Sequence, residues 1–465
     1  MKRAISFLLV FLLTSLLATA QMLKGKITNS SGEPVPYATI YIQELREGTA
    51  ANSRGDYEIR IPAGKYVVIY QSMGYAPQYF NIDISVRDLV KDVILPMQYY
   101  QIPEVRISAT GEDPAYGIMR KAIGMAPYYL NCVSYYKSDV YIKGSMVVKR
   151  IPKLFSLTIS TKTNGEETKT PIPRTGDTYL MESNNLIEFT APDKVVQKVL
   201  SINSTFPSED DKISPIDFVT ASFYSSQPVG PGISPLSPQS FSYYKFKYVG
   251  ATLQGNNTIN KIQVIPKMKS QQLFEGNIYI IEDLWCLHSL DLSISTVVGK
   301  INVQQIYIPV KNEIWMPVSL KIDADLSFLG VKVYAGYGTS IKYLEVSPNT
   351  SLHKPESVTS FYYERNDIKT PSDALVSKNQ KKIEEILDKE KLTNGDMIKL
   401  AKLMEKESKE TLPDSVRDNL EIKDNTKTIV EKDADKKDSS YWAEIRPIPL
   451  TDLEKRSIIK RDSVR

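Results

Sequence analysis

A turn followed by a β-strand is predicted by the segment Gly32-Glu33-Pro34-Val35-Pro36-Tyr37-Ala38-Thr39-Ile40-Tyr41-Ile42, in which a turn cluster precedes a β-branched and aromatic stretch. Two shorter segments repeat this arrangement, Gly55-Asp56-Tyr57-Glu58-Ile59 and Gly64-Lys65-Tyr66-Val67-Val68. In each case glycine supplies the turn and the residues after it favour a strand. Short strands separated by turn signals at this spacing are typical of a small sandwich. We therefore predict a β-sandwich over residues 21–98.

The first residues have the pattern of an export signal. Met1-Lys2-Arg3 is basic, and Ile5 to Leu17 is mostly apolar but shorter than the roughly 20 residues that cross a bilayer. Ala18-Thr19-Ala20 has the small-x-small form of a cleavage site. We predict that residues 1–20 are a signal peptide, cut between Ala20 and Gln21, and that the protein is exported to the periplasm or the outer membrane.

The composition favours half-buried strands and argues against nucleic acid as a partner. The chain has 465 residues, which is enough for two or three domains. Its 58 Lys and Arg nearly cancel its 54 Asp and Glu, whereas a nucleic-acid binder carries a strong basic stripe. Tyrosine is abundant, with 28 residues against 13 phenylalanines. A tyrosine ring packs on a sheet while its hydroxyl stays in water, so the protein is expected to be rich in exposed sheet.

The sandwich segment resembles a known domain. Residues 22–97, including Gly74-Tyr75 after the central strand, resemble the carboxypeptidase regulatory-like domain, a seven-stranded transthyretin-like sandwich found on exported bacterial proteins. The resemblance implies a folding, spacing or protein-binding unit, because this domain is not the catalytic part of a carboxypeptidase.

A helix and a long series of strands are expected over residues 99–365. Asp113 is a favourable N-cap before Pro114, and the apolar residues from Ala115 to Ile123 fall at helical spacing, which predicts about three turns ending near Gly124. From Tyr135 to Tyr343 strand follows strand with short loops, so we expect one large curved antiparallel sheet. Three local expectations complete this region: a linking strand at Pro103–Ile107, a helix at Lys194–Ile202 and a loop folded over the sheet at Pro228–Ser240.

Dispersed motifs add two further resemblances. Asp113–Ile123, Tyr135–Lys143, Trp315–Val318 and Tyr441–Leu450 together resemble an uncharacterised family of Gram-negative envelope proteins with a regulatory-like sandwich in front. In that family an outer-membrane β-barrel usually follows, so we expect a shortened member or a barrel encoded separately. The order of one helix followed by long strands is also similar to the half-barrels of periplasmic lipoprotein carriers.

The last hundred residues read as a charged tail. Residues 366–465 are rich in Lys, Asp, Glu, Asn and Ser, with helical spacing at Ser372–Leu387 and Asp396–Lys409. Glu410–Ser440 has few apolar residues and is expected to be disordered. Residues 441–450 turn aromatic and apolar again, which predicts a docking segment.

Catalytic motifs are missing from the sequence. The chain has only two histidines, His288 and His353, which we interpret as a half-buried strand residue and a loop residue. The sequence contains none of the residue spacings typical of zinc sites. It also lacks the G-x-S-x-G nucleophile elbow and the glycine-rich loops that bind phosphate. Asp323 with Asp325, and the Glu209–Asp211 run, are interpreted as solvated surface carboxylates. We therefore predict no catalytic, cofactor-binding or metal-binding residues.

These observations favour a non-enzymatic envelope protein. It would bind a protein partner by strand addition at the sandwich edge, or form the soluble part of an outer-membrane assembly. A first alternative is a carrier of lipid or another apolar ligand in the concave face of the sheet, and a second is a glycan- or peptide-cleaving enzyme. Cys132 and Cys286 either pair as a disulfide or remain buried thiols. The side chains expected to face an apolar ligand are Phe246, Tyr248, Ile262, Val264, Tyr279 and Ile281.

Overall fold

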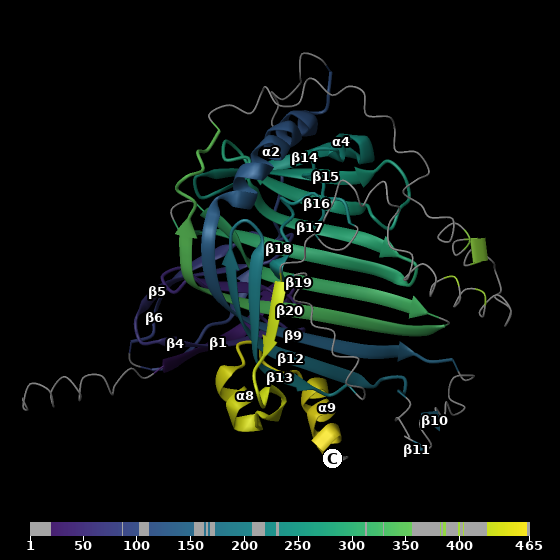
Figure 1. Cartoon of the computed structure of the whole chain (residues 1–465). Coiled ribbons are helices and arrows are strands. Elements are labelled where there is room, and N and C mark those ends of the chain that lie inside the picture. The colour runs from purple at the N-terminus through teal and green to yellow at the C-terminus, as the bar shows by residue number, and fades with distance from the viewer. Residues whose placement is uncertain are drawn as a thin grey trace, which may run out of the picture.

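The computed structural model shows a mainly β protein in which a small sandwich is joined edge to edge with one large curved sheet (Figure 1). The expected export signal, the linking strand at 103–107 and most of the two tail helices lie outside the described residues. The structure describes residues 20–85, 87–101, 111–152, 162–163, 166–167, 173–206, 219–228, 232–311, 314–328, 330–355, 382, 385–386, 399, 403 and 426–462.

The N-terminal sandwich packs two sheets around one apolar core. One sheet has the order β4-β1-β7, with β8 also pairing with β1, and the other has the order β3-β2-β5-β6. Gly25 allows the connection between β7 and β8 to lie close against β1 within the first sheet, because a Cβ there would lie 2.1 Å from the carbonyl oxygen of Lys91. The strands are β1 Ala20–Asn29, β2 Thr39–Ile42, β3 Glu47–Ala50, β4 Asp56–Pro62, β5 Lys65–Gln71, β6 Gln78–Asp83, β7 Leu89–Val90 and β8 Val93–Leu95.

The large sheet is an antiparallel meander in which β14 to β20 follow one another in sequence, and β9, β12 and β13 continue it beyond β20. This arrangement and the sandwich confirm the fold class predicted from the sequence. β10 Lys162–Thr163 pairs antiparallel with β11 Glu166–Glu167 in a separate two-stranded sheet. The strands of the large sheet are β9 Val133–Arg150, β12 Thr178–Thr190, β13 Lys194–Ser204, β14 Tyr244–Gln254, β15 Asn257–Pro266, β16 Phe274–Ile281, β17 Leu287–Thr296, β18 Gly299–Lys311, β19 Ile314–Phe328 and β20 Val331–Pro348.

The helix expected at Lys194–Ile202 is wrong, because this segment is part of β13. Its burial alternates along the strand, and it pairs with β12 from Met181 to Thr190. Three valines in the segment favour a strand, and pairing with a long neighbour outweighs the weak helical spacing.

Helix α2 (Pro114–Asn131) begins where the sequence indicates and continues past its expected end at Gly124. The Asp113 carboxylate accepts a hydrogen bond from the Ala115 amide at 2.9 Å, as predicted for an N-cap. Glycine within a helix costs only about 1 kcal/mol relative to alanine, and burial of Met125 and Ala126 beyond it offsets this cost. The helix lies across the upper strands of the sheet (Figure 1), and a short helix, α4 (Ser240–Tyr243), leads into β14.

The two bodies meet at β20. This strand pairs with β19 as far as Gly338 and then with β3 of the sandwich at Ile341 and Lys342. Gly48 allows β3 to lie close to β19 as well, because a Cβ on it would lie 2.7 Å from the carbonyl oxygen of Val318 on β19. The β3 edge of the sandwich is therefore occupied by the chain itself, and β6 is the opposite edge of the same sheet.

Part of the segment expected to be disordered is ordered. Within Glu410–Ser440, Thr426–Val430 forms β21, which lies parallel to β13, and Ala434–Lys436 forms the short helix η3. The β-branched sequence Thr-Lys-Thr-Ile-Val supports a strand once an edge is present to pair with it. Helices α8 (Ser439–Ile445) and α9 (Asp452–Asp462) come next and lie beside the lower end of the sheet (Figure 1). Across the described ranges, the helices are all too short or too polar to cross a membrane.

Candidate functional site

The C-terminal docking site is the place where α8, α9 and the loop between them pack against both the sandwich and the large sheet. Trp442 and Ile448 are buried there in a cluster with Ala50 of β3 and Tyr141 of β9. The Thr49 hydroxyl donates to the carbonyl of Pro447 at 3.0 Å. The C-terminal segment therefore holds the two bodies together through both apolar and polar contacts.

A buried ion pair lies at the centre of this site. Arg446 donates to both carboxylate oxygens of Glu182, with Nε–Oε1 at 2.5 Å and Nη2–Oε2 at 2.8 Å. The hydroxyl of Tyr141 and the amide of Asn203 donate to the same carboxylate at 2.6 and 3.0 Å. Glu182 is fully buried on β12, so its four contacts replace the water that an exposed carboxylate would have.

Each titratable group at this ion pair keeps one protonation state at neutral pH. Burial alone would raise the pKa of Glu182, but the hydrogen bonds and charge of Arg446, with Tyr141 and Asn203, lower that pKa below its usual value. Burial, reinforced by the neighbouring carboxylate, holds the pKa of Tyr141 well above its usual value. Burial works against the charge of Arg446, but the contact with Glu182 raises the net pKa of Arg446. The group therefore stays a charged pair with a neutral tyrosine, which suits docking rather than proton transfer.

A second buried pair anchors α9. Lys143 Nζ lies 2.8 Å from Glu454 Oε2 and donates to the carbonyl of Pro449 at 2.8 Å. Burial lowers the pKa of Lys143 despite the neighbouring carboxylate. Glu454 also accepts from the Thr451 amide at 2.7 Å, and the Thr451 hydroxyl accepts from the Glu454 amide at 3.4 Å. This reciprocal arrangement is a capping box, so one glutamate both starts the helix and binds it to the sheet.

The charged residues of these two pairs were not predicted from the sequence; they are Glu182, Lys143, Arg446 and Glu454. The T-x-x-E pattern at 451–454 was an available signal for the start of α9. Glu182 and Lys143 gave no such signal, because a charged residue in a strand usually faces water.

The six side chains expected to face an apolar ligand do not share one face of the sheet. Tyr248 pairs directly with Ile262, which pairs with Ile278, so the side chains of these three point to the same side. Tyr279 is the next residue along β16 and points to the opposite side together with Ile281. Phe246 and Val264 pair with each other and lie on the same side as Tyr248. The prediction thus combined residues of both faces.

All six are buried in one apolar cluster that includes the inward face of α2. The ring of Phe246 lies 6.0 Å from that of Tyr116 on α2 and 5.6 Å from that of Phe241. On the other face, the ring of Tyr279 lies 5.9 Å from that of Tyr100 in the segment after the sandwich. Their part of the sheet is therefore covered by the chain itself on both sides.

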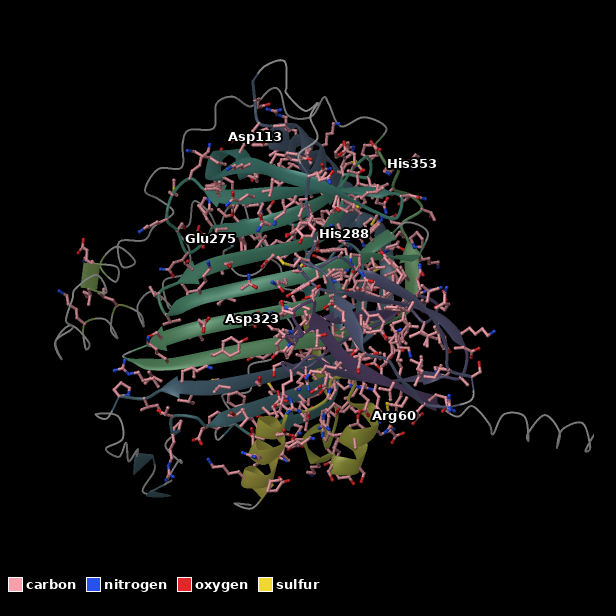
Figure 2. All side chains as sticks on the ribbon, turned by 180° about the vertical axis from the view of Figure 1, so that it is seen from behind. Arg60, Asp113, Glu275, His288, Asp323 and His353 are labelled. Carbon is pink, nitrogen blue, oxygen red and sulfur yellow. The ribbon has the colours of Figure 1, made fainter. Side chains whose placement is uncertain are left out.

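The histidines and acidic residues singled out from the sequence do not converge (Figure 2). His288 is half-buried on β17, where burial lowers its pKa to about 4 and its ring contacts the Ser289 hydroxyl at 3.0 Å. His353 is exposed in a loop. Asp323 pairs with Lys321 at 2.8 Å and accepts from the Tyr334 hydroxyl at 2.5 Å. Within the described ranges no three metal-binding side chains form a cluster, and the Glu209–Asp211 run lies outside those ranges.

A small cavity lies between the sandwich and the sheet. Its volume is about 30 Å³, and Gln71, Gln98, Tyr279, His288 and Ser289 are among the residues that line it. The amide nitrogen of Gln71 is buried there without a hydrogen-bond partner in the described part of the protein. A polar cavity of this size accommodates a water molecule, which would satisfy that donor.

Cys132 and Cys286 are free thiols in this structure, and both are buried. Burial raises the pKa of Cys132 to about 11 and that of Cys286 to about 12, so the reactive thiolate is scarce at neutral pH. We expect a disulfide-exchange reagent to modify neither thiol in the folded protein and both after unfolding without reductant. The measurement is the number of thiols per chain that react at pH 8, read from the absorbance of the released reagent. A reading of zero after unfolding would indicate the disulfide instead.

Comparisons with known proteins identify two regions of the chain. The CarboxypepD_reg-like domain matches residues 23–107, and a family of unknown function, DUF5686, matches residues 118–344. No curated protein matches the sequence.

Among solved structures, a DUF1329 family protein from Desulfovibrio piger is 11% identical, with 52% of this chain and 96% of that chain covered and a TM-score of 0.22. A LolA superfamily protein from Nitrosomonas europaea is 10% identical, with coverages of 50% and 92% and a TM-score of 0.20. A DUF3823 family protein from Bacteroides ovatus is 11% identical, with coverages of 37% and 93% and a TM-score of 0.16. The chain thus matches a regulatory-like domain in its N-terminal part and a family of unknown function in its central part.

Proposed function

We propose that this chain is a non-enzymatic protein of the cell envelope that binds a protein partner along the β6 edge of its sandwich. The export pattern in residues 1–20 and the regulatory-like domain support the envelope location. The observation that carries the binding proposal is β6 itself, which ends its sheet and pairs only with β5 in the part of the chain that the structure describes. An open edge strand is a template for a further strand.

The backbone groups available on β6 can be assigned from the register. Val67 of β5 uses its amide and carbonyl on the β2 side, where the amide donates to Glu44 and the carbonyl accepts from Gln43. Asn81 lies directly opposite Val67, so the pair is not hydrogen-bonded and the amide and carbonyl of Asn81 point to the free edge. By the same alternation Tyr79 and Asp83 also direct their backbone groups outward.

Exposed apolar side chains border this edge. Tyr79 of β6 is 51% exposed and Leu253 at the tip of β14 is 72% exposed, while Met97 (63%) and Tyr99 (78%) lie in the segment that pairs with Gly74 and Tyr75 just before β6. The Gln254 amide donates to the Tyr79 hydroxyl at 3.1 Å, which places the β14 tip beside β6. Large exposed apolar groups gathered in this way mark an interaction surface. A partner strand on β6 would pack its own apolar side chains against them.

Two other edges are closed. The β3 edge pairs with β20, which excludes the opposite end of the same sheet. On β14, Gln101 exchanges two backbone hydrogen bonds of 2.8 Å with Ala251, and Asp113 accepts from the Tyr248 amide at 2.9 Å. Such blocking is how proteins protect edge strands from unwanted pairing. The open β6 edge contrasts with this protection.

Lipid carriage in the concave face is the weaker candidate. Phe246 and Tyr248 would have to release α2 before an acyl chain could occupy their place. Native mass spectrometry of the intact protein tests this alternative, and a stoichiometric co-purifying lipid would support it.

Replacing Tyr79 by lysine is expected to weaken partner binding about 10- to 100-fold, because anchoring aromatic residues contribute roughly 1–3 kcal/mol at protein interfaces. Asn81→Pro is expected to act similarly, since it removes a free-edge donor without removing a β5–β6 hydrogen bond. Site-specific photocrosslinking from position 79 in the cell envelope identifies the partner. The partner is then purified, and its binding to the unmodified protein and to each variant is measured.

Val90→Asp is the matched control, since Val90 is also exposed, at 64%, but lies on the other sheet of the sandwich. It should leave partner binding unchanged. Equal crosslinking from positions 79 and 90, or full binding by Tyr79→Lys and Asn81→Pro, would refute the proposal.

A further inference from the structure

We infer that the edge of β13 is a second docking surface, which accepts an extended, β-branched segment of a partner protein that ends in an acidic residue, and that β21 occupies it as a removable cover. This surface is distinct from the β6 edge and stands independently of the function proposed above. Three features of the molecule support it: the weak hold on β21, the separate anchoring of the chain after β21, and the side chains that β13 presents to β21.

The cover strand is held almost entirely by its backbone. Residues Thr426 to Val430 pair with Val195 to Val199, and this is the one parallel pairing within the large sheet as described. The side chains of all five β21 residues are exposed. Parallel pairing is slightly less stable per residue than antiparallel pairing, and burial of side chains adds little here. The strand therefore opens more easily than its neighbours.

The segment after β21 is anchored separately. Ala434 of η3 is buried, and Trp442 and Arg446 hold α8 in the C-terminal docking site. Because these anchors begin after Glu431, β21 can leave the β13 edge while α8 and α9 remain in place. Release of the cover thus breaks the local backbone ladder and the contacts of Thr428 and Glu431 with β13.

Those two contacts define the chemistry of the occupant. The Thr428 hydroxyl donates to Gln197 Oε1 at 3.2 Å, and Lys198 Nζ lies 2.7 Å from Glu431 Oε1 just beyond the strand. The rest of the recognition is made by backbone groups, which read an extended conformation rather than a sequence. The fitting partner segment is therefore β-branched and extended, runs parallel to β13 and carries an acidic residue at its end to pair with Lys198.

Register supplies a matched pair of variants. The Glu431 amide donates to the Val199 carbonyl at 2.9 Å, so by alternation the amide of Ile429 faces β13 and that of Val430 faces away. Ile429→Pro removes a ladder donor, whereas Val430→Pro places the same ring on the outer side. Both residues are exposed β-branched side chains, so the two variants lose similar side-chain contacts.

The test uses the full chain and a fluorescent peptide with the sequence of residues 424–432, Asp-Asn-Thr-Lys-Thr-Ile-Val-Glu-Lys. We expect Ile429→Pro to bind this probe at least tenfold more tightly than the unmodified protein or Val430→Pro. A probe with lysine at the Glu431 position should bind more weakly than the original. By the same alternation the amides of Val195, Gln197 and Val199 face β21, so their hydrogen exchange should be faster in Ile429→Pro and slow again when the probe binds.

The inference fails if Ile429→Pro gains no affinity for the probe, or if the amides of Val195, Gln197 and Val199 stay protected in that variant. It also fails if the charge-reversed probe binds equally well, because Lys198 would then have no part in recognition. Tyr79→Lys should bind the probe like the unmodified protein, so a failure of the β6 proposal remains distinguishable from a failure here.

Discussion

Replacing Arg446 by methionine is expected to weaken the docking of α8 by about 3–5 kcal/mol, because the variant leaves a buried carboxylate without its cation. Glu182 is fully buried and accepts two hydrogen bonds from Arg446, so water cannot take over while α8 stays docked. Native-state hydrogen exchange at the amides of α8 measures the free energy of this opening. Arg456→Met is the matched control, because Arg456 is exposed on α9 and should change the opening energy by less than about 0.5 kcal/mol.

The pH dependence of α8 opening provides a second test of the ion pair between Glu182 and Arg446. The pKa of Glu182 is lowered in the docked state, so its contribution is full above the usual glutamate pKa of about 4.3 and is lost as the pH falls below it. The unmodified protein should therefore open at α8 more readily below about pH 4. In a variant that carries both Arg446→Met and Glu182→Gln, this part of the acid dependence should disappear. If Arg446→Met opens no more readily than Arg456→Met, the ion pair does not support docking.

Local signals were sufficient for the parts of the fold that neighbouring residues decide. Asp113 before Pro114 marks the start of α2, because N-capping and the fixed φ of proline act within one turn. The glycine-led strands around Ile40 and Val68 indicated the sandwich for the same reason, since turn and alternation are both local. The family resemblance was then confirmed over residues 23–107.

Pairing between distant strands could not be read in this way. The helical spacing at Lys194–Ile202 is a local pattern, but β12 and β21 pair with this segment from elsewhere in the chain. The assignment of Tyr279 to the same face as Ile262 failed for a related reason, because a shift of one residue in register moves a side chain to the other face. Register between strands depends on the whole sheet.

The docking site shows the same limit for charged residues. Lys143 and Glu182 become buried only because α8 and α9 return from the end of the chain with Glu454 and Arg446. In an isolated strand each would be interpreted as a surface residue. Trp442 was the exception, because an aromatic cluster after a long polar stretch already indicates that the segment binds to something.

Replacing Trp442 by alanine is expected to destabilise the docked C-terminal segment by about 3–5 kcal/mol, the usual effect of truncating a buried aromatic residue. Trp442 is 3% exposed and packs with Ile448 against Ala50 and Tyr141, so its loss leaves a cavity between the sandwich and the sheet. The segment should then open and expose α8 to limited proteolysis. Tyr441→Phe is the matched control, because it removes only the 3.2 Å contact with the Ser201 hydroxyl, a change of roughly 0.5–1.5 kcal/mol.

Combining Trp442→Ala with Arg446→Met distinguishes docking as one unit from two independent contacts. Both residues lie on α8 and its end, so once either substitution has released the segment the other has little left to weaken. The double variant should therefore open only slightly more readily than the worse single variant, by less than the sum of the two effects. If the two contacts are independent, their opening energies should add. The segment would then open in parts and not as one docked unit. Hydrogen exchange at Thr49, whose hydroxyl donates to the Pro447 carbonyl, can be compared among the same variants. It reports whether the sandwich loosens from the sheet when the segment leaves.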